Sequence, residues 1–339
     1  MKALIGSSSQ LEAALEQLRR AASLPRPIVI VGERGSGKEL FAERLHYLSS
    51  RWDGPLVSLN CAAISETLMD AELFGYEKGA FTGATQRTPG RFERAHGGSL
   101  FLDEIGTMSA RVQEKCLRAI EYGHIERLGG RDRIEVDVRV IAATNEDLRR
   151  KVELGEFRAD LLDRLTFDVI RVPPLRERQE DIAVLAEHFA LRLCSEIGRD
   201  FFPGFTPAAI RQLQSHHWPG NVRELKNVVE RSVAYATPDH QVEQILLDPF
   251  AQYFEARQEE TKSNTSESTE STRNHEQAAA EPLLADPDQP FLGQVAAFER
   301  QLLQRSLTAN RHKLQETAQQ LQLSYHQLRR LIKKHRIQV

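Results

Sequence analysis

The sequence predicts an α/β domain with a parallel sheet, a smaller α-helical subdomain after it, and a separate all-α domain at the end of the chain. Two apolar runs, 28–31 and 99–102, each end in a polar segment, as strands do at the carboxyl edge of a parallel sheet. The composition also changes sharply near residue 250, where patterned apolar sequence gives way to polar sequence. A chain of 339 residues is too long for one compact core, so several domains are expected.

A glycine-rich loop joins the first of these strands to a helical pattern that runs through Leu40, Phe41 and Leu45. The loop consists of Gly32, Glu33, Arg34, Gly35, Ser36, Gly37, Lys38 and Glu39. Glycines allow backbone N–H groups to surround phosphate oxygens, the helix N-terminus adds a favourable dipole, and the lysine reaches the terminal phosphates. An ordinary glycine turn before a helix is the alternative, but the acids described next argue against it. The loop therefore predicts a nucleotide-binding site.

Two adjacent acids, Asp103 and Glu104, follow the second apolar run. This arrangement is typical of a carboxylate that holds Mg²⁺ and a carboxylate that activates water. An acidic helix cap would explain Asp103 alone, without its pairing to a phosphate-binding lysine. A third apolar strand, 138–143, ends at Thr144 and Asn145, where a polar side chain could sense the terminal phosphate, although such a pair is also common in turns.

Between the two halves of this site lies a hexapeptide with no obvious part in nucleotide binding. It consists of Gly79, Ala80, Phe81, Thr82, Gly83 and Ala84. A flexible surface loop would explain the glycines but not an exposed phenylalanine between them. We interpret the hexapeptide as a loop that acts on another molecule and is moved by the bound nucleotide.

With these motifs, the chain resembles the sigma-54-dependent transcriptional activators, the bacterial enhancer-binding proteins of the AAA+ class, over nearly its whole length. The resemblance implies a P-loop NTPase wedge with a parallel sheet and an α-helical lid, with ATP and Mg²⁺ as cofactors. It also implies that ATP hydrolysis remodels the closed complex of sigma-54 RNA polymerase holoenzyme into an open complex. The hexapeptide of this family contacts sigma-54, so Phe81 and Thr82 are the expected contact residues.

The resemblance assigns roles around the nucleotide as well. Lys38 would bind the β- and γ-phosphates, Asp103 the Mg²⁺, and Glu104 would polarise the attacking water. Asn60 matches a switch asparagine that holds the glutamate away until the nucleotide state changes, and Asn145 resembles the first sensor.

Three further residues follow from the same resemblance. Arg158 and Arg164 resemble arginine fingers that act on the nucleotide of a neighbouring subunit, which implies a homo-oligomer, expected to be a hexamer. Each of these arginines taken alone could equally be a solvated helix residue. Arg223, in the segment 218–225, resembles the second sensor on the lid, and Glu39 matches the residue that this family carries after the lysine.

Composition and charge divide the chain into four parts. We expect the α/β wedge at 1–172, the helical lid at 173–250, a disordered acidic linker at 251–290 and a helix-turn-helix DNA-binding domain at 291–339. The linker has nine acidic and three basic residues, whereas 299–339 has nine basic and two acidic residues. The final domain is therefore cationic, which favours enhancer DNA as a partner.

The last two of three helical patterns in this domain are separated by the short turn 322–324, as in a helix-turn-helix. Ser324 would cap the second helix. A basic hairpin packed on the ATPase is the alternative. The expected DNA contacts are Tyr325, His326, Gln327, Arg329 and Arg330, with Lys333 and Lys334 at phosphates.

Cysteines and hydropathy exclude several other classes. Cys61, Cys116 and Cys194 lie far apart in the sequence, which predicts reduced thiols and neither disulfides nor a zinc site. The sequence has neither a run of 18 apolar residues nor a signal-peptide pattern, so we expect a cytoplasmic protein without membrane insertion.

Regulation is expected to come from outside the chain, because only 31 residues precede Gly32. This plan, together with residues 46–52, resembles the phage-shock subgroup of the family, whose members are held inactive by a negative regulator, phage shock protein A. Trp52 is the candidate docking residue, although a tryptophan folded onto its own domain is equally expected. Two other interpretations are an AAA+ motor with another client and a DNA-binding regulator with a vestigial ATPase, which a measurement of ATP turnover would separate.

Overall fold

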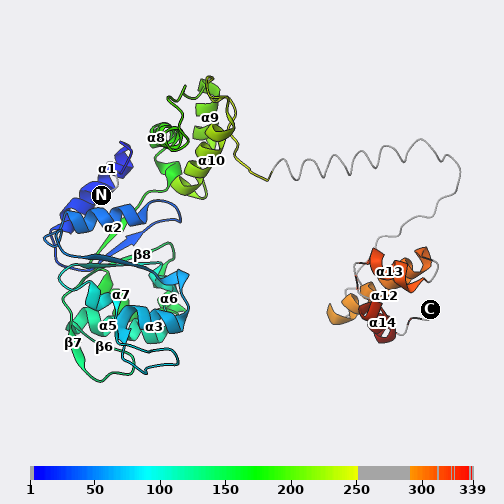
Figure 1. Cartoon of the computed structure of the whole chain (residues 1–339), viewed down its shortest axis with the longest axis horizontal. Helices are drawn as coiled ribbons and strands as arrows, with labels where there is room; N and C mark the ends of the chain where they lie inside the picture. The colour runs from blue at the N-terminus through cyan, green and yellow to red at the C-terminus, as the bar shows by residue number, and fades with distance from the viewer. Residues whose placement is uncertain are drawn as a thin grey trace. The chain divides into compact units, whose positions relative to one another are not determined.

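The computed structural model describes residues 4–250, 291–310, 313–321, 323, 325–335 and 337, except the side chains of 291–298, 309 and 326. The chain divides into two compact units, Met1–Ala256 and Arg257–Val339, and each is considered by itself (Figure 1).

A five-stranded parallel sheet forms the centre of the first unit, in the order β2-β5-β8-β1-β9. Its strands are β1 (Ile28–Val31), β2 (Leu56–Asn60), β5 (Ser99–Asp103), β8 (Arg139–Thr144) and β9 (Asp168–Arg171). The three central strands are almost entirely buried, because a parallel sheet covered on both faces favours apolar side chains on both sides. The predicted parallel sheet is confirmed.

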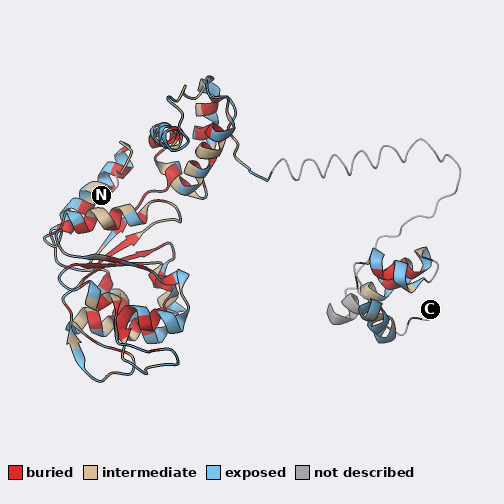
Figure 2. Ribbon diagram, in the orientation of Figure 1, coloured by how far each residue is buried: buried red, intermediate tan, exposed pale blue. Residues whose placement is uncertain are grey.

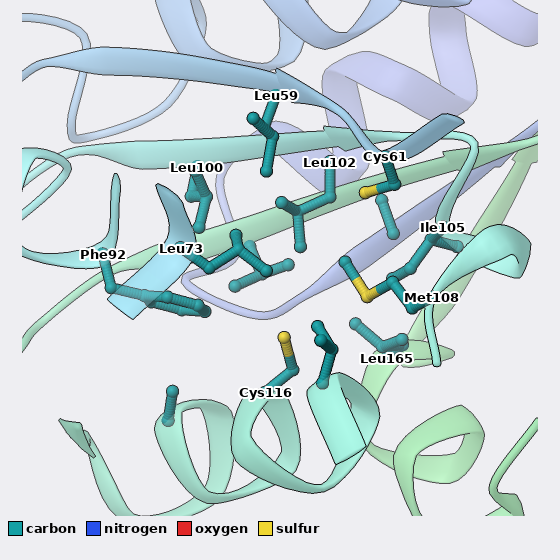
Figure 3. Close-up of a cluster of buried hydrophobic side chains, with 14 of the residues drawn as sticks. Leu59, Cys61, Leu73, Phe92, Leu100, Leu102, Ile105, Met108, Cys116 and Leu165 are labelled. Carbon is teal, nitrogen blue, oxygen red and sulfur yellow. The ribbon is translucent and has the colours of Figure 1, made fainter. Parts of the chain in front are cut away.

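Helices cover both faces of the sheet (Figure 1). One face packs against α1 (Ser9–Ala22) and α2 (Lys38–Tyr47). The other carries α3 (Glu66–Phe74), α4 (Arg91–Arg94), α5 (Ala110–Tyr122), α6 (Leu148–Glu153) and α7 (Ala159–Leu165). Beneath this second face, Leu100 and Leu102 of the sheet meet Cys116 of α5 (Figure 3). Helix α5 ends at Gly123, whose φ of 65° is readily adopted by glycine.

Two short antiparallel hairpins extend from the wedge. The first pairs β3 (Gly75–Tyr76) with β4 (Thr88–Pro89), and the hexapeptide lies in the loop between these strands. The second pairs β6 (His124–Glu126) with β7 (Arg133–Glu135). The hairpins are joined by Leu128, whose N–H donates to Gly75 O at 3.0 Å and whose carbonyl accepts from the N–H of Glu77 at 3.0 Å.

The lid has its own hydrophobic core, as expected for a separate subdomain (Figure 2). It consists of the 3₁₀ helix η3 (Leu175–Glu177) followed by α8 (Glu180–Glu196), α9 (Pro207–Ser215) and α10 (Asn221–Tyr235). Leu225, Val228 and Val229 are buried on α10 and Val222 packs partly against them, as the helical spacing predicts. Trp218 is fully buried and donates its Nε1–H to Leu213 O at 2.8 Å.

The second unit contains the helices α12 (Phe291–Ala309), α13 (Leu314–Gln320) and α14 (Tyr325–Lys334). Leu303, Ala318 and Leu328, one from each helix, form the centre of its small core. Within the described residues from 291 onward, three helices lie where three were predicted. Ser324, which was predicted to cap the last helix, lies outside the described part of the chain. Gln322, in the same turn, also lies outside it.

Within the described ranges, no helix is long and apolar enough to span a membrane. All three cysteines are free and buried. The described residues also contain no cluster of His, Cys, Asp and Glu side chains that could hold a metal ion by themselves.

Candidate active site

The carboxyl edge of the sheet brings together the residues predicted to bind nucleotide. Strand β1 leads into the glycine loop, β5 ends at Asp103, and β2 ends at Asn60, which lies directly beside Asp103 in the register. Strand β8 ends at Thr144, the partner of Val31 on β1. Ligands of open α/β sheets bind at this edge, so parallel pairing assembles one site from four separate segments.

The glycine loop wraps around its own lysine. Gly35 and Gly37 have φ angles of 74° and 104°, which favour glycine, and Lys38 begins α2. Lys38 is buried, and its Nζ donates to Gly32 O at 3.0 Å and to Glu33 O at 3.4 Å. The Oγ of Ser36 is buried without a hydrogen-bond partner. Glu39 lies exposed in the first turn of α2.

Two carboxylates lie beside this lysine. The Glu104 carboxylate is 3.6 Å from Lys38 Nζ. Asp103 accepts a hydrogen bond from the N–H of Glu104 at 3.1 Å, yet burial and the neighbouring Glu104 charge raise its pKa despite the opposing effect of Lys38. Two acids against one lysine leave the site short of positive charge, which fits a divalent cation at Asp103.

Asn60 contacts a different acid from the one expected. Its Nδ2 donates to Asp103 Oδ2 at 3.2 Å, and its Oδ1 accepts from the N–H of Ala62 at 2.9 Å. Glu104 has a φ of 53°, a left-handed conformation, and its carboxylate lies near Lys38. In this structure Asn60 therefore orients Asp103, and the expected contact with Glu104 is not the one it makes.

The two polar residues at the end of β8, Thr144 and Asn145, differ in exposure. Asn145, the expected sensor, is exposed. Thr144 is fully buried, and its Oγ1 accepts from the N–H of Glu146 at 2.9 Å. The carbonyl of Thr144 accepts from the N–H of Gly32 at 3.1 Å, which joins the end of β8 to the glycine loop.

The lid rests directly on the glycine loop. The N–H of Arg223 donates to Gly35 O at 3.3 Å, and a Cβ on Gly35 would lie 2.3 Å from Gly220 O, so this position accepts only glycine without a shift of the backbone. The side chains of Arg223 and Arg34 are exposed and line the same cleft of about 340 Å³. The backbone of Arg223 thus contacts the glycine loop, and the role of its side chain as second sensor stays a prediction.

The lid also makes contacts that the sequence did not predict. Glu33 binds Arg176 and Asn221 rather than lying in the phosphate cradle. The guanidinium of Arg178 is buried and donates to Ser36 O at 3.0 Å. In the sequence these two arginines are ordinary charged residues after a Pro-Pro pair, so no local signal distinguished them from solvated ones.

Arg158 and Arg164 lie at the two ends of α7 and are engaged with acids of their own chain. Arg158 forms two hydrogen bonds with Asp160, at 3.0 and 2.6 Å, and Arg164 pairs with Glu121. The two arginine side chains are exposed, 40% for Arg158 and 56% for Arg164, so solvent screens both pairs and each costs little to break.

The hexapeptide protrudes as a closed turn. The N–H of Gly79 donates to Ala84 O at 2.9 Å, and Gly79 and Gly83 have φ angles of 82° and 102° with nothing within 4 Å of an added Cβ. Phe81 is 44% exposed and packs edge-on against Tyr76, with 4.9 Å between the ring centroids. Thr82 beside it is exposed.

Two further predicted surfaces are accessible. Trp52 is 62% exposed, and the adjacent Arg51 fixes its turn by donating to Asp137 Oδ1 at 2.6 Å. In the second unit, Arg329, Arg330 and Lys333 lie exposed on α14. The other expected DNA contacts are less uniform. Tyr325 is exposed with Arg329 over its ring, Gln327 is exposed, Lys334 pairs with Glu299 at 2.8 Å, and the His326 side chain lies outside the description.

Comparisons with known proteins agree with this geometry. Residues 4–171 match the model of the sigma-54 interaction domain, and residues 176–267 match that of the AAA+ ATPase lid domain. The chain is 51% identical over 335 residues to the Psp operon transcriptional activator of Escherichia coli K12, covering 98% of each chain. It is 50% identical over 229 residues to the Nif-specific regulatory protein of Azotobacter vinelandii, covering 68% of this chain and 44% of that one.

Solved structures lead to the same conclusion. The structure of NtrX from Brucella abortus in complex with ATP superimposes with a TM-score of 0.67 at 32% identity, covering 99% of this chain and 70% of that one. A complex of the same protein with ADP gives the same score at 31% identity. The P-loop, the paired acids, the lid and the hexapeptide thus occur together in a known kind of ATPase, and the chain belongs to the sigma-54-dependent transcriptional activators of the AAA+ class.

Proposed function

We propose that this activator uses ATP hydrolysis to move the hexapeptide against sigma-54 in the closed complex of the holoenzyme, and that it does so at phage-shock promoters. The observation that carries the proposal is the exposed Phe81 on a turn whose two glycines meet no neighbouring atoms. The two glycines leave the tip of the turn free to change its backbone angles, while Ala84 at its base is buried and Phe81 packs against Tyr76. The match to an activator of the Psp operon supports the choice of promoters.

The residues of the site divide the hydrolysis between them. Lys38 would exchange its two loop carbonyls for phosphate oxygens, which are stronger acceptors because they are charged. Glu104, 3.6 Å from that lysine, would polarise the attacking water, and Asn60 would orient Asp103. Mg²⁺ held by Asp103 would neutralise charge on the phosphates. Asn145, exposed after the end of β8, would sense the terminal phosphate.

A ring of subunits, expected to be a hexamer, would complete each site. Arg158 and Arg164 would leave Asp160 and Glu121 and supply positive charge to the nucleotide of the neighbouring subunit. The exposure of both pairs supports this exchange, because water replaces the lost contacts.

The second unit would bind enhancer DNA through α14. Arg329, Arg330 and Lys333 give this helix an exposed cationic surface, and the small core that joins α13 to α14 supports a helix-turn-helix. Tyr325, Gln327 and the residue at position 326 lie in its first turn, the part that reaches base edges in such domains. Lys334, which pairs with Glu299, is expected to contribute less than Lys333. The cytoplasm is the expected site of action, because the polymerase and the promoters are there.

A negative regulator resembling phage shock protein A would dock at Trp52. The high exposure of this side chain argues against the alternative in which it folds onto its own domain, and Arg51 holds the turn in place.

The test is a binding measurement with purified sigma-54 in the presence of ADP and aluminium fluoride, which together mimic the transition state of ATP hydrolysis. Phe81→Ala should lose nucleotide-dependent binding to sigma-54. Phe201→Ala is the control, because it removes an exposed phenylalanine of the lid (57% exposed) and should retain this binding. Nucleotide-dependent binding that survives Phe81→Ala would sink the assignment of the loop. ATP turnover without any sigma-54 binding by the unaltered chain would instead indicate a motor with another client.

A further inference from the structure

The side chain of Glu33, in the glycine loop (the P-loop, residues 32–39), faces the lid. The Glu33 carboxylate accepts hydrogen bonds from the two Nη groups of Arg176 at 2.8 and 2.6 Å, and from Nδ2 of Asn221 at 3.0 Å. These bonds, those from Arg176 first, lower the pKa of Glu33 to about 2. The carboxylate is therefore charged throughout the neutral pH range, and its hydrogen bonds are made to residues of the lid.

Asn221 makes this contact part of a buried junction. It is fully buried at the start of α10, has a φ of 53°, and also donates to Arg34 O at 3.1 Å. Its Oδ1 accepts from the N–H of Leu175 at 2.8 Å. One side chain therefore joins the P-loop, the hinge between wedge and lid, and the helix that carries Arg223.

The backbone of Glu33 faces the opposite way, toward the phosphate-binding lysine. Its carbonyl accepts from Lys38 Nζ at 3.4 Å, beside the stronger contact of that lysine with Gly32 O at 3.0 Å. Glu33 thus contacts Lys38 through its carbonyl and the lid through its carboxylate. Among the described residues of the glycine loop, Glu33 is the one whose side chain bonds both an arginine and an amide of the lid.

We propose that Glu33 is a positioning residue for ATP binding, which holds the lid, and with it Arg223, against the P-loop through Arg176 and Asn221. The proposal rests on the ATP site and not on the action of the hexapeptide. We call the Glu33–Arg176 contact the latch. Its loss lowers the fraction of molecules whose lid is correctly placed, so the KM for ATP rises by the factor by which that fraction falls. The kcat changes little, because ATP at saturation restores the closed arrangement.

The test compares Glu33→Gln, Arg176→Gln and the double variant in the full chain by steady-state ATP hydrolysis. Each single variant should raise KM about three- to fivefold, the range expected for an exposed ion pair, with kcat within about twofold of the original. The double variant should be no worse than either single one, because all three lose the same contact. Arg192→Gln is the matched control, since this exposed lid arginine pairs with Glu196 at 2.9 Å, and its KM should not change.

Two results would overturn the latch. A rise in KM with Glu33→Gln but not with Arg176→Gln would place the carboxylate on the nucleotide itself. Multiplied effects in the double variant would show that the two residues act separately. If Glu33→Gln fails to fold in a thermal unfolding scan, Arg176→Gln decides alone, because its side chain is 42% exposed and an unchanged KM would then refute the proposal. Open-complex formation at saturating ATP should survive all three variants, which separates this test from that of the hexapeptide.

Discussion

Glycines serve opposite purposes in the P-loop and in the hexapeptide. An added Cβ on Gly35 would lie 2.3 Å from the carbonyl of Gly220 on the lid, and one on Gly32 would lie 3.0 Å from Ser36 Oγ. An added Cβ on Gly79 or Gly83 would meet nothing within 4 Å, although both have positive φ. The P-loop thus uses glycine to permit close contact, and the hexapeptide uses it to permit movement. The ATP site and the loop that we propose hydrolysis moves thus differ in what surrounds their glycines.

Removal of the catalytic base should stop ATP hydrolysis without touching either group of glycines. Glu104→Gln keeps the shape of the side chain but removes the base, so kcat for ATP hydrolysis should fall by about 10² to 10⁴. The affinity for ATP, measured by equilibrium binding, should be retained. Hydrolysis at more than about a tenth of the original rate would mean that another group activates the water.

The next effect breaks the close contact at the P-loop. Gly35→Ala should weaken ATP binding about tenfold or more, because the methyl group meets the lid and a left-handed residue costs about 1–2 kcal/mol. Gly97→Ala is the matched control, since Gly97 has a φ of 77° and nothing within 4 Å of an added Cβ. Titration with a fluorescent ATP analogue should show the control binding normally. Equal losses in both variants would show that the backbone angle, and not the lid, decides.

A smaller effect is expected at the hexapeptide. Gly83→Ala adds a methyl group in open space, so it should cost only about 1 kcal/mol of stability from backbone strain and leave ATP turnover within about twofold. Promoter opening should suffer more than turnover, because the strained residue restricts the loop. Measuring both in the same preparation checks this, and parallel losses would contradict the separation of the two regions.

The smallest effect concerns stability and pH. The pKa of Asp103 is raised from its ordinary value of 3.8 by burial and by Glu104, so the folded chain binds this proton more tightly than the unfolded chain. As pH rises through the raised pKa of Asp103, ionisation of this carboxyl group therefore lowers the free energy of unfolding. Asp103→Asn should unfold at a higher temperature than the original at neutral pH, with the difference vanishing in acid. A lower unfolding temperature at neutral pH would refute this account of the site.

Short motifs on single segments could be predicted from the sequence. The P-loop, the acids after β5 and the hexapeptide each depend on neighbours a few residues apart, and the parallel sheet then brings the strand ends together. The lid and its helical core followed from apolar spacing on α10. These predictions succeeded because local spacing determines local structure.

Contacts between distant segments could not be predicted. Glu33 and Arg176 are 143 residues apart, and either could have been an ordinary solvated charge. Trp218 and Asn221 adopt positive φ without being glycine, so the tight turn that delivers Arg223 carries no glycine signal at those positions. Asn60 was expected at Glu104, but the left-handed backbone of Glu104 leaves that carboxylate near Lys38 and places Asn60 on Asp103.

The most direct test of the central claim measures ATP turnover and promoter melting together for Thr82→Ala. Purified protein would be mixed with sigma-54 holoenzyme, ATP and a linear promoter carrying the enhancer, and melting would be followed by permanganate reactivity of unpaired thymines. The account predicts ATP turnover close to that of the original chain with little or no melting. Melting that persists in Thr82→Ala, or that is lost only in proportion to ATP turnover, would contradict the claim that the hexapeptide is the part that hydrolysis drives against sigma-54.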